Sequence, residues 1–205
     1  MSLQINIGVT PGREYMLEFM LTNLDRVLDY CNMKHETYIS LLSEDPAEIE
    51  NRNIAHLYDS IAFSENSPLH ERYNDIISYN PERSDWILKL DMDCLVSYEF
   101  FGNYLDHKSK QGIGLIGFTR SLFFEPSTMR CKEVNNVTAP IGTVFVHASV
   151  AKRFFSEGNL DGVLFQRIRS MGLSFILDEG DACVMDFKDG LNDWGYDEIG
   201  GKELF

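Results

Sequence analysis

Two aspartates, Asp91 and Asp93, stand one residue apart directly after the apolar run 86–90. Residues at positions i and i+2 of a strand project to the same side, so the two carboxylates are expected to lie together, with Met92 turned away. Adjacent carboxylates repel each other unless a cation joins them, and hard oxygen ligands suit Mg²⁺ or Mn²⁺. The pair therefore predicts a divalent-cation site that bridges to the phosphate oxygens of a substrate.

Two other motif matches fail because of their context. An EF-hand loop that began at Asp91 would need glycine and glutamate where Val96 and Gly102 stand. The segment 112–117 matches G-x-G-x-x-G, but its apolar residues make it a strand, and no clear helix follows. A dinucleotide-binding turn must lie between a strand and a helix, so NAD or FAD binding is not expected.

The elements that position the aspartate pair alternate between strand and helix. Apolar runs closed by turn residues predict strands at 4–9, 37–42, 60–63 and 86–90, and apolar residues at helical spacing predict helices at 14–30, 47–57 and 69–77. This order indicates an α/β domain, related to the Rossmann fold, with a mostly parallel central sheet flanked by helices. Ligands bind at the carboxyl ends of such strands, where the pair stands.

The second half of the chain is less regular. A stretch from 119 to 138 is interpreted as irregular, and it carries three basic residues, Arg120, Arg130 and Lys132, which fit either a solvated loop or a site for an anionic ligand. From residue 189 the sequence is acidic and glycine-rich, which predicts a loosely packed tail. The other predicted elements are a helix at 99–108, strands at 113–118 and 142–146, helices at 148–155 and 161–171, and strands at 175–177 and 182–185.

Composition narrows the class of protein. The 205 residues fit one domain, and the formal charge of −14 disfavours tight non-specific binding to nucleic acids or anionic membranes. No apolar run of about 18 residues is present, and the N-terminus does not resemble a signal peptide, so we expect no membrane span and a cytoplasmic location, which for a viral protein means the host cytoplasm. The four cysteines are scattered, which is typical of reduced thiols.

The motifs, in chain order and over most of the chain, resemble those of the GT-A glycosyltransferases, especially the family 2-like group. The loop Thr10-Pro11-Gly12-Arg13 resembles the family's nucleotide-facing opening, and Asp91-Met92-Asp93 is similar to its D-x-D motif. The segment 66–74 is similar to N-x-G-x-x-x-A-R-N, with proline in place of the glycine and tyrosine in place of the arginine. The segment 160–167 is similar to E-D-x-x-L-x-x-R, with leucine in place of the first glutamate.

The resemblance implies a metal-dependent transfer of a sugar from a nucleotide-sugar, with a UDP-sugar as the expected donor and Mn²⁺ or Mg²⁺ as cofactor. Asp161 matches the aspartate that serves as acceptor base in inverting members. Asp186 occupies the place where some members have a third metal ligand, usually histidine. The implied metal ligands are Asp91, Asp93 and Asp186. The implied nucleotide-sugar contacts are Thr10, Arg13, Glu44, Asp45, Arg72, Asn74 and Asp91.

In the same terms, residues 1–95 would form the nucleotide-sugar-binding half, 96–190 the acceptor-binding half, and 191–205 a tail. The acceptor is open: a polysaccharide, a protein, a small molecule or modified bases in viral DNA. Two alternatives remain. A nucleotidyltransferase shares the nucleotide-binding half-fold and an aspartate pair, and a noncatalytic nucleotide- or carbohydrate-binding module would keep the fold without turnover.

Overall fold

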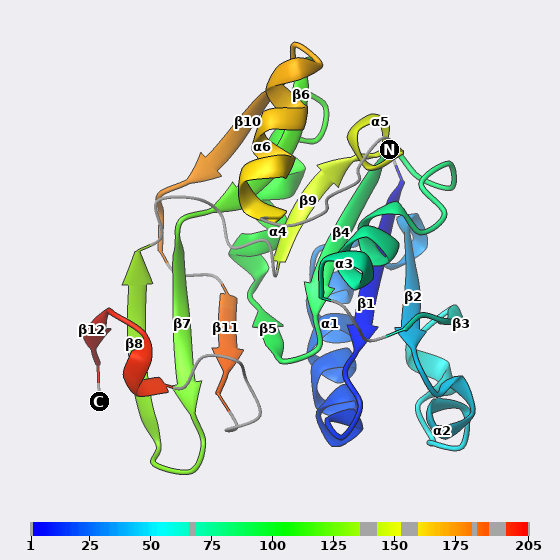
Figure 1. Ribbon diagram of the computed structural model, residues 1–205, viewed down its shortest axis with the longest axis vertical. Helices are drawn as coiled ribbons and strands as arrows, with labels where there is room; N and C mark the ends of the chain where they lie inside the picture. The colour runs from blue at the N-terminus through cyan, green and yellow to red at the C-terminus, as the bar shows by residue number, and fades with distance from the viewer. Residues whose placement is uncertain are drawn as a thin grey trace.

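The computed structural model describes residues 2–65, 69–135, 143–152, 160–181, 184–188 and 196–204, without the side chains of residues 69, 70, 160–162 and 198. Within these residues the strands form two sheets, one of seven strands and one of five (Figure 1). No helix among them is long and apolar enough to cross a membrane.

The larger sheet is mixed, with parallel pairing predominating. β1 pairs in parallel with β2 and β4, β2 with β3, and β6 with β10, whereas β9 runs antiparallel to both β4 and β6. This confirms the expected α/β architecture. In their order across the sheet the strands are β10 (Ser174–Asp178), β6 (Ile113–Phe118), β9 (Thr143–His147), β4 (Trp86–Asp91), β1 (Leu3–Val9), β2 (Thr37–Ser43) and β3 (Ser60–Phe63).

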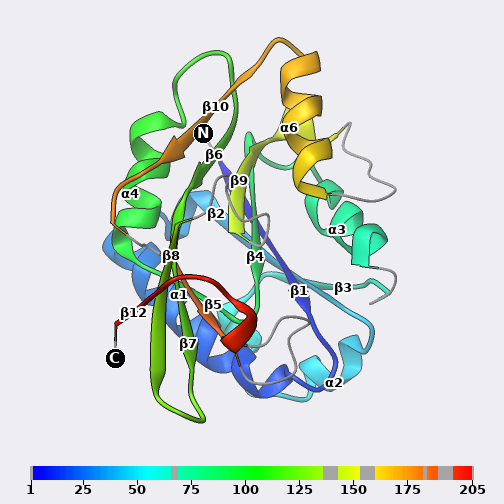
Figure 2. The same cartoon turned by 60° about the vertical axis from the view of Figure 1, so that its left-hand side comes forward.

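Helices cover both faces of this sheet. Figure 2 shows α1 and α4 on one side of the strands and α3 and α6 on the other. The α-helices are α1 (Leu17–Tyr30), α2 (Pro46–Glu50), α3 (Leu69–Ser78), α4 (Tyr98–His107), α5 (Ala148–Ala151) and α6 (Leu160–Ser170). Short 3₁₀ turns lie at Glu14–Met16, Lys34–Glu36, Ala55–Leu57 and Tyr196–Glu198.

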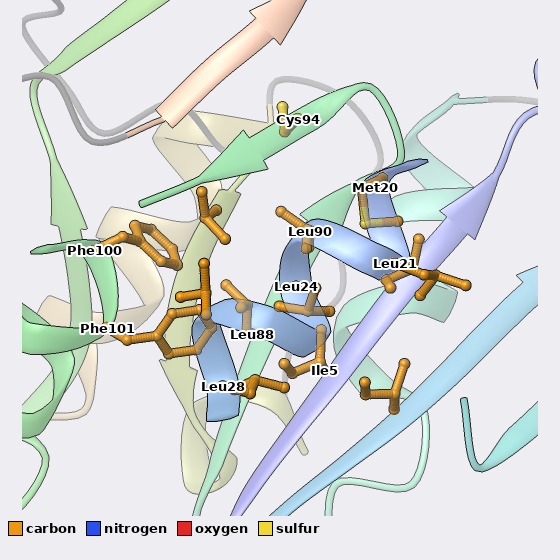
Figure 3. Close-up of a cluster of buried hydrophobic side chains, with 14 of the residues drawn as sticks. Ile5, Met20, Leu21, Leu24, Leu28, Leu88, Leu90, Cys94, Phe100 and Phe101 are labelled. Atoms are coloured by element: carbon orange, nitrogen blue, oxygen red, sulfur yellow. The ribbon is translucent and has the colours of Figure 1, made fainter. Parts of the chain in front are cut away.

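The main hydrophobic core lies between α1, α4 and one face of the sheet (Figure 3). The helical spacing predicted for α1 is confirmed, because the apolar residues of that spacing are all buried: Leu17, Met20, Leu21, Leu24, Val27 and Leu28. From α4, the ring of Tyr104 stacks on that of Phe145 with centroids 4.5 Å apart. The side chain of Cys94 lies at the edge of the same core.

The opposite face of β1 is polar although it is buried. Gln4 and Asn6 are completely buried, and their side-chain amides donate hydrogen bonds to the carbonyl oxygens of Ile76 and Tyr79 at the end of α3, over 2.7–3.2 Å. The last carbonyls of a helix have no partner within the helix, so these two amides satisfy them. The contact holds α3 against β1 on this face of the sheet.

The smaller sheet corrects the prediction that residues 119–138 are irregular. β7 (Arg120–Glu125) and β8 (Arg130–Asn135) form an antiparallel hairpin within it. Both strands carry many polar residues because their charges pair across the sheet: Arg120 bonds Glu133. The five strands, in their order across the sheet, are β12 (Lys202–Glu203), β8, β7, β11 (Val184–Phe187) and β5 (Cys94–Val96).

The last described segment, 196–204, is packed on this hairpin, which corrects the prediction of a loose tail for these residues. Tyr196 is only 2% exposed, and Lys132 donates hydrogen bonds to the carbonyl oxygens of Tyr196 and Ile199. Arg130 forms ion pairs with Asp197 and Glu203. The three basic residues Arg120, Arg130 and Lys132 therefore pair with groups of the smaller sheet and of the segment packed on it.

Two predicted helices are shorter than expected. α2 ends at Glu50 rather than continuing to residue 57, and a separate 3₁₀ turn follows it. Its start is sharp because the carboxylate of Asp45 accepts a hydrogen bond from the backbone N–H of Glu48, with Pro46 at the first helical position. α5 ends at Ala151, and residues 153–155 of its predicted span lie outside the described residues.

Candidate functional site

Asp91 and Asp93 lie where the two sheets meet. Asp91 is the last residue of β4, beside Gly8 of β1, and Asp93 lies in the turn that leads into β5. The pair therefore does not continue one straight strand, as the i, i+2 spacing had suggested. β5 then pairs antiparallel with β11, which sets Cys94 directly opposite Asp186.

This pairing brings Asp93, Cys94 and Asp186 together, with potential ligand atoms within 4.8 Å of one another. A backbone hydrogen bond of 2.9 Å from the N–H of Phe187 to the carbonyl oxygen of Asp93 fixes the junction. Oδ1 of Asp186 is buried and has no hydrogen-bond partner in the described part of the chain. A buried carboxylate oxygen without a donor is costly, and a cation would satisfy it.

Each of the three aspartates has a different cationic partner. Nζ of Lys89 lies 2.5 Å from Oδ1 of Asp91. A guanidinium nitrogen of Arg13 lies 2.9 Å from Oδ2 of Asp93. Nζ of Lys188 lies 2.9 Å from Oδ2 of Asp186.

Burial and mutual repulsion disfavour the ionised form of two of these carboxylates, Asp93 and Asp186, and so raise their pKa values. Burial, with the negative charge of Asp91 next in size, raises the pKa of Asp93, while Arg13 and Lys188 act to lower it. Burial and the charge of Asp93 raise the pKa of Asp186 to about 7, against the lowering effect of Lys188. Repulsion of this kind falls when a cation joins the carboxylates.

The donor set fits Mg²⁺ or Mn²⁺ through its two carboxylates, Asp93 and Asp186. Cys94 belongs to the same group by distance, but its thiol is buried, and burial raises its pKa well above the ordinary value. A protonated thiol is a poor ligand for hard cations. Asp91, predicted as a third ligand, is ion-paired with Lys89, and its charge acts on both other aspartates.

α3 adds a buried cation and a ring next to Asp91. Arg72 is 8% exposed, and burial lowers its pKa, while the charges of Asp91, Glu44 and Asp93 act to raise it. A Cβ atom at Gly8 would lie 2.4 Å from Cδ1 of Ile76 and 3.1 Å from a guanidinium nitrogen of Arg72. Nζ of Lys89 lies over the ring of Tyr73, 3.7 Å from the ring centroid. Asn74, predicted to contact the nucleotide-sugar, lies on the same helix and is 7% exposed.

A pocket of about 520 Å³ opens between the loops that follow β1 and β2. Its lining includes Glu44 and Asp45, two of the predicted nucleotide contacts, and the turn at Gly12, whose φ of 83° favours glycine. The complete lining is Pro11, Gly12, Glu14, Ser43, Glu44, Asp45 and Glu48. Arg13 stands in the sequence between the lining residues Gly12 and Glu14, and its side chain forms an ion pair with Asp93.

Three of the carboxylates that line this pocket already bond groups of the neighbouring loops and of α2. Glu14 accepts a hydrogen bond from the N–H of Gly12, Asp45 caps α2, and Glu48 forms an ion pair with Arg52. Of the remaining predicted contacts, Thr10 donates its backbone N–H to Sδ of Met92 at 3.0 Å. Asp161 lies in the first turn of α6, and its side chain is outside the described residues.

Sequence reasoning missed Lys89, Cys94 and Lys188. Lys89 and Lys188 each stand two residues from an aspartate along the chain, so the i, i+2 rule that joined Asp91 to Asp93 also predicts these pairs. The sequence showed Cys94 only as one of four scattered cysteines. Its place opposite Asp186 depends on the pairing of β5 with β11, which no local pattern reveals.

Cation binding at this site is expected to depend on pH. Because the pKa of Asp186 is raised to about 7, a proton occupies it at lower pH and competes with the metal. Mn²⁺ affinity should fall by about tenfold per pH unit below that value and level off above it. Electron paramagnetic resonance of free Mn²⁺ measures the binding, and Asp186→Asn should flatten the profile. An Mn²⁺ affinity that stays constant through pH 7 in the unsubstituted protein contradicts the role of Asp186 as a metal ligand.

No protein-family model matches the sequence, and no curated protein matches it. Solved structures do match in fold. The catalytic domain of Drosophila β1,4-galactosyltransferase 7 in complex with xylobiose is 15% identical, with a TM-score of 0.52 over 90% of this chain and 68% of that one. A mutant of the same enzyme, in complex with manganese, UDP-Gal and xylobiose, is 14% identical, with a TM-score of 0.53 over 88% of this chain and 66% of that one.

Two further solved structures are similar. TarS of S. aureus, residues 1–349, is 11% identical with a TM-score of 0.63, over 91% of this chain and 60% of that one. The 4-diphosphocytidyl-2C-methyl-D-erythritol synthase of Anaerococcus prevotii is 16% identical with a TM-score of 0.56, over 88% and 89%. The chain thus spans 60% to 68% of the length of the glycosyltransferase structures. At these identities the similarity establishes the fold, and the chain has the fold of the GT-A glycosyltransferases.

Proposed function

We propose that this protein is a metal-dependent glycosyltransferase that moves a sugar from a nucleotide-sugar to an acceptor hydroxyl. The observation that carries the proposal is the meeting of Asp93 and Asp186, with a buried and unpartnered carboxylate oxygen among the described residues, beside a pocket at the carboxyl ends of β1 and β2. In open α/β sheets this edge is where ligands bind.

The charges around the site suggest how a nucleotide-sugar lies. The pocket is lined by carboxylates, which repel phosphates but accept hydrogen bonds from ribose hydroxyls and from the N–H groups of a base. The cations Arg13, Arg72 and Lys188 gather instead around the aspartates. The nucleoside therefore occupies the pocket, and the diphosphate points toward the aspartates. A UDP-sugar is the donor we test first.

Asp93 and Asp186 would hold the cation, with Asp91 adding negative charge beside them. When bound, Mn²⁺ or Mg²⁺ supplies positive charge that stabilises a nucleoside diphosphate as leaving group. Arg72 contributes fixed positive charge from a buried position and needs no reorganisation to do so. Gly8 leaves room for Ile76 and for this guanidinium, since a Cβ atom there would lie 2.4 Å from the first and 3.1 Å from the second.

Asp161 is proposed as the base that takes the proton of the acceptor hydroxyl, which makes the transfer inverting. We expect Asp161→Asn to leave donor binding unchanged and to lower transfer by at least about a hundredfold, since general-base catalysis contributes that much or more. Donor binding by calorimetry and turnover by nucleotide release separate the two effects, with Asp106→Asn on α4 as control. Transfer that survives the substitution excludes Asp161 as the base.

We assign residues 1–95 to the donor half and 96–190 to the acceptor half. A screen of hydroxyl-bearing acceptors with the active donor identifies the acceptor class. The hydroxyl-bearing candidates are a polysaccharide, a protein, a small molecule and modified bases of viral DNA.

A nucleotidyltransferase is the second candidate, because the synthase of A. prevotii matches over 89% of its own length. The two activities separate by their substrates. Purified protein with Mn²⁺ or Mg²⁺ is incubated either with nucleotide-sugars, scoring release of nucleoside diphosphate, or with nucleoside triphosphates and sugar phosphates, scoring pyrophosphate. Nucleoside diphosphate release supports the glycosyltransferase, and pyrophosphate release supports the alternative. Metal-dependent binding without either product indicates a noncatalytic module.

A further inference from the structure

Each of the three aspartates of the site already has a cationic partner within the protein. Asp91, Asp93 and Asp186 each face one cation, at 2.5, 2.9 and 2.9 Å respectively. Two of the cations are shielded from solvent: the side chain of Lys89 is 0% exposed and that of Arg13 is 7% exposed. The third cation, Lys188, belongs to none of the motifs of the chain.

Lys188 and a divalent cation would compete for the same carboxylate. Lys188 bonds Oδ2 of Asp186, while Oδ1 of that residue, which has no partner among the described residues, is the atom available to a metal. A divalent ion on one oxygen and an ammonium on the other lie a few ångströms apart, and two positive charges at that separation repel each other. Metal binding therefore weakens the ion pair between Lys188 and Asp186.

Lys188 has a support that does not depend on Asp186. Its Nζ lies 4.9 Å from the ring centroid of Phe123 on β7, and its backbone N–H donates to the carbonyl oxygen of Phe124 at 2.8 Å. The backbone is therefore fixed while the ammonium end can change partner. The side chain of Lys188 is 10% exposed, close to the 7% of Arg13.

We propose that Lys188 is a donor-binding residue that exchanges the carboxylate of Asp186 for the diphosphate of the nucleotide when a divalent cation binds Asp186. The inference rests on the proposed function for the identity of the anion. It makes metal and nucleotide binding cooperative, because the cation frees Lys188 and the diphosphate then neutralises both.

The exchange predicts effects of opposite sign for one substitution. In Lys188→Gln, Asp186 has lost its competing cation, so Mn²⁺ alone should bind more tightly, by about threefold or more. UDP in the presence of saturating Mn²⁺ should bind more weakly, by about tenfold, which is the loss of one charge-assisted hydrogen bond. Lys188→Arg keeps the charge and should keep UDP binding close to that of the unsubstituted protein.

The test measures Mn²⁺ binding by electron paramagnetic resonance and UDP binding by calorimetry, in the unsubstituted protein, Lys188→Gln, Lys188→Arg and the exposed Lys152→Gln as control. Thermal melting confirms that each variant is folded. Tighter Mn²⁺ with weaker UDP in Lys188→Gln alone supports the exchange. Weaker binding of both ligands overturns it, since Lys188 would then only position Asp186, and unchanged UDP binding also overturns it.

The test of the Lys188 exchange can fail or succeed independently of the test for glycosyltransferase activity. If UDP-sugars are turned over and Lys188→Gln binds UDP normally, the exchange fails and the glycosyltransferase stands. If no nucleotide-sugar is turned over but the two opposite shifts appear, the exchange stands in a protein that binds nucleoside diphosphates without transferring sugar.

Discussion

Replacing Asp93 with asparagine is expected to lower nucleotide-sugar turnover by about a thousandfold without destabilising the fold. The carboxylate is one of the two that fit the cation, and loss of metal charge stabilisation at a leaving group costs several kcal/mol, or about three powers of ten in rate. Asparagine keeps the shape and an oxygen that accepts a hydrogen bond from Arg13, but it carries no charge.

Stability should stay equal or rise because the folded protein disfavours this charge. Burial and Asp91 raise the pKa of Asp93 above 3.8, so the folded state binds its proton more tightly than the unfolded chain does. The contribution of Asp93 to stability therefore falls as pH rises from about 4 through the folded pKa, and it is unfavourable at neutral pH. Asparagine removes that contribution.

The experiment pairs nucleotide release at saturating Mn²⁺ with thermal melting at neutral pH. A variant that is inactive and melts at the same or a higher temperature agrees with a functional carboxylate held at a cost to stability. A variant that keeps more than about a tenth of its turnover removes Asp93 from the metal site. A large fall in melting temperature would show that Asp93 serves chiefly as the partner of Arg13.

Replacing Asp91 with asparagine, unlike the substitution of Asp93, should destabilise the protein, by about 3–5 kcal/mol. Its partner, Lys89, is completely buried on the face of β4 that packs toward α3, and burial already lowers the pKa of that lysine. Without Asp91 the ammonium has lost its closest counter-charge and must either stay charged without that partner or lose its proton. Both outcomes cost free energy in the folded state.

The double variant Asp91→Asn with Lys89→Met is the control for this prediction. Methionine fills a similar volume without a charge, so the double variant should recover most of the stability lost in Asp91→Asn. Denaturant unfolding measures the free energy of each protein. If Asp91→Asn loses less than about 1 kcal/mol, or if the double variant is no more stable than the single one, the ion pair with Lys89 is not what holds this strand end.

The strands of the first half of the chain could be predicted because their signal is local. The apolar run before Asp91 and the turn residues Thr10-Pro11-Gly12 after β1 are consecutive in the sequence, and β1, β2, β3 and β4 lie within one residue of their predicted ends. The strand β11, which carries Asp186, ends two residues later than predicted. The pocket also lies between the two loops that sequence reasoning selected, after β1 and after β2. The prediction of the sheet's carboxyl edge as the ligand edge needed only the order of the elements.

Other features depend on partners far away in the chain. Gln4 and Asn6 are buried because the end of α3, some 70 residues later, offers carbonyls to them, and nothing nearby in the sequence announces that. β7 and β8 were missed because the charges of Arg120 and Glu133 obscure the apolar–polar alternation, although they neutralise each other once the hairpin forms. The neighbourhood of Asp93 and Asp186 depends in the same way on the register of β5 with β11.

The most direct measurement of the central claim is nucleoside diphosphate release from a panel of nucleotide-sugars, with UDP-sugars first, in Mn²⁺ and again after chelation of the metal. A metal-dependent glycosyltransferase should release nucleoside diphosphate from at least one donor, lose that release with chelator, and recover it when Mn²⁺ or Mg²⁺ is restored. Release from Asp93→Asn should stay near background under all of these conditions. If release does not change with the metal or with Asp93→Asn, there is no functional metal site at these aspartates. If no donor gives either release or metal-dependent nucleotide binding, the protein is not a glycosyltransferase.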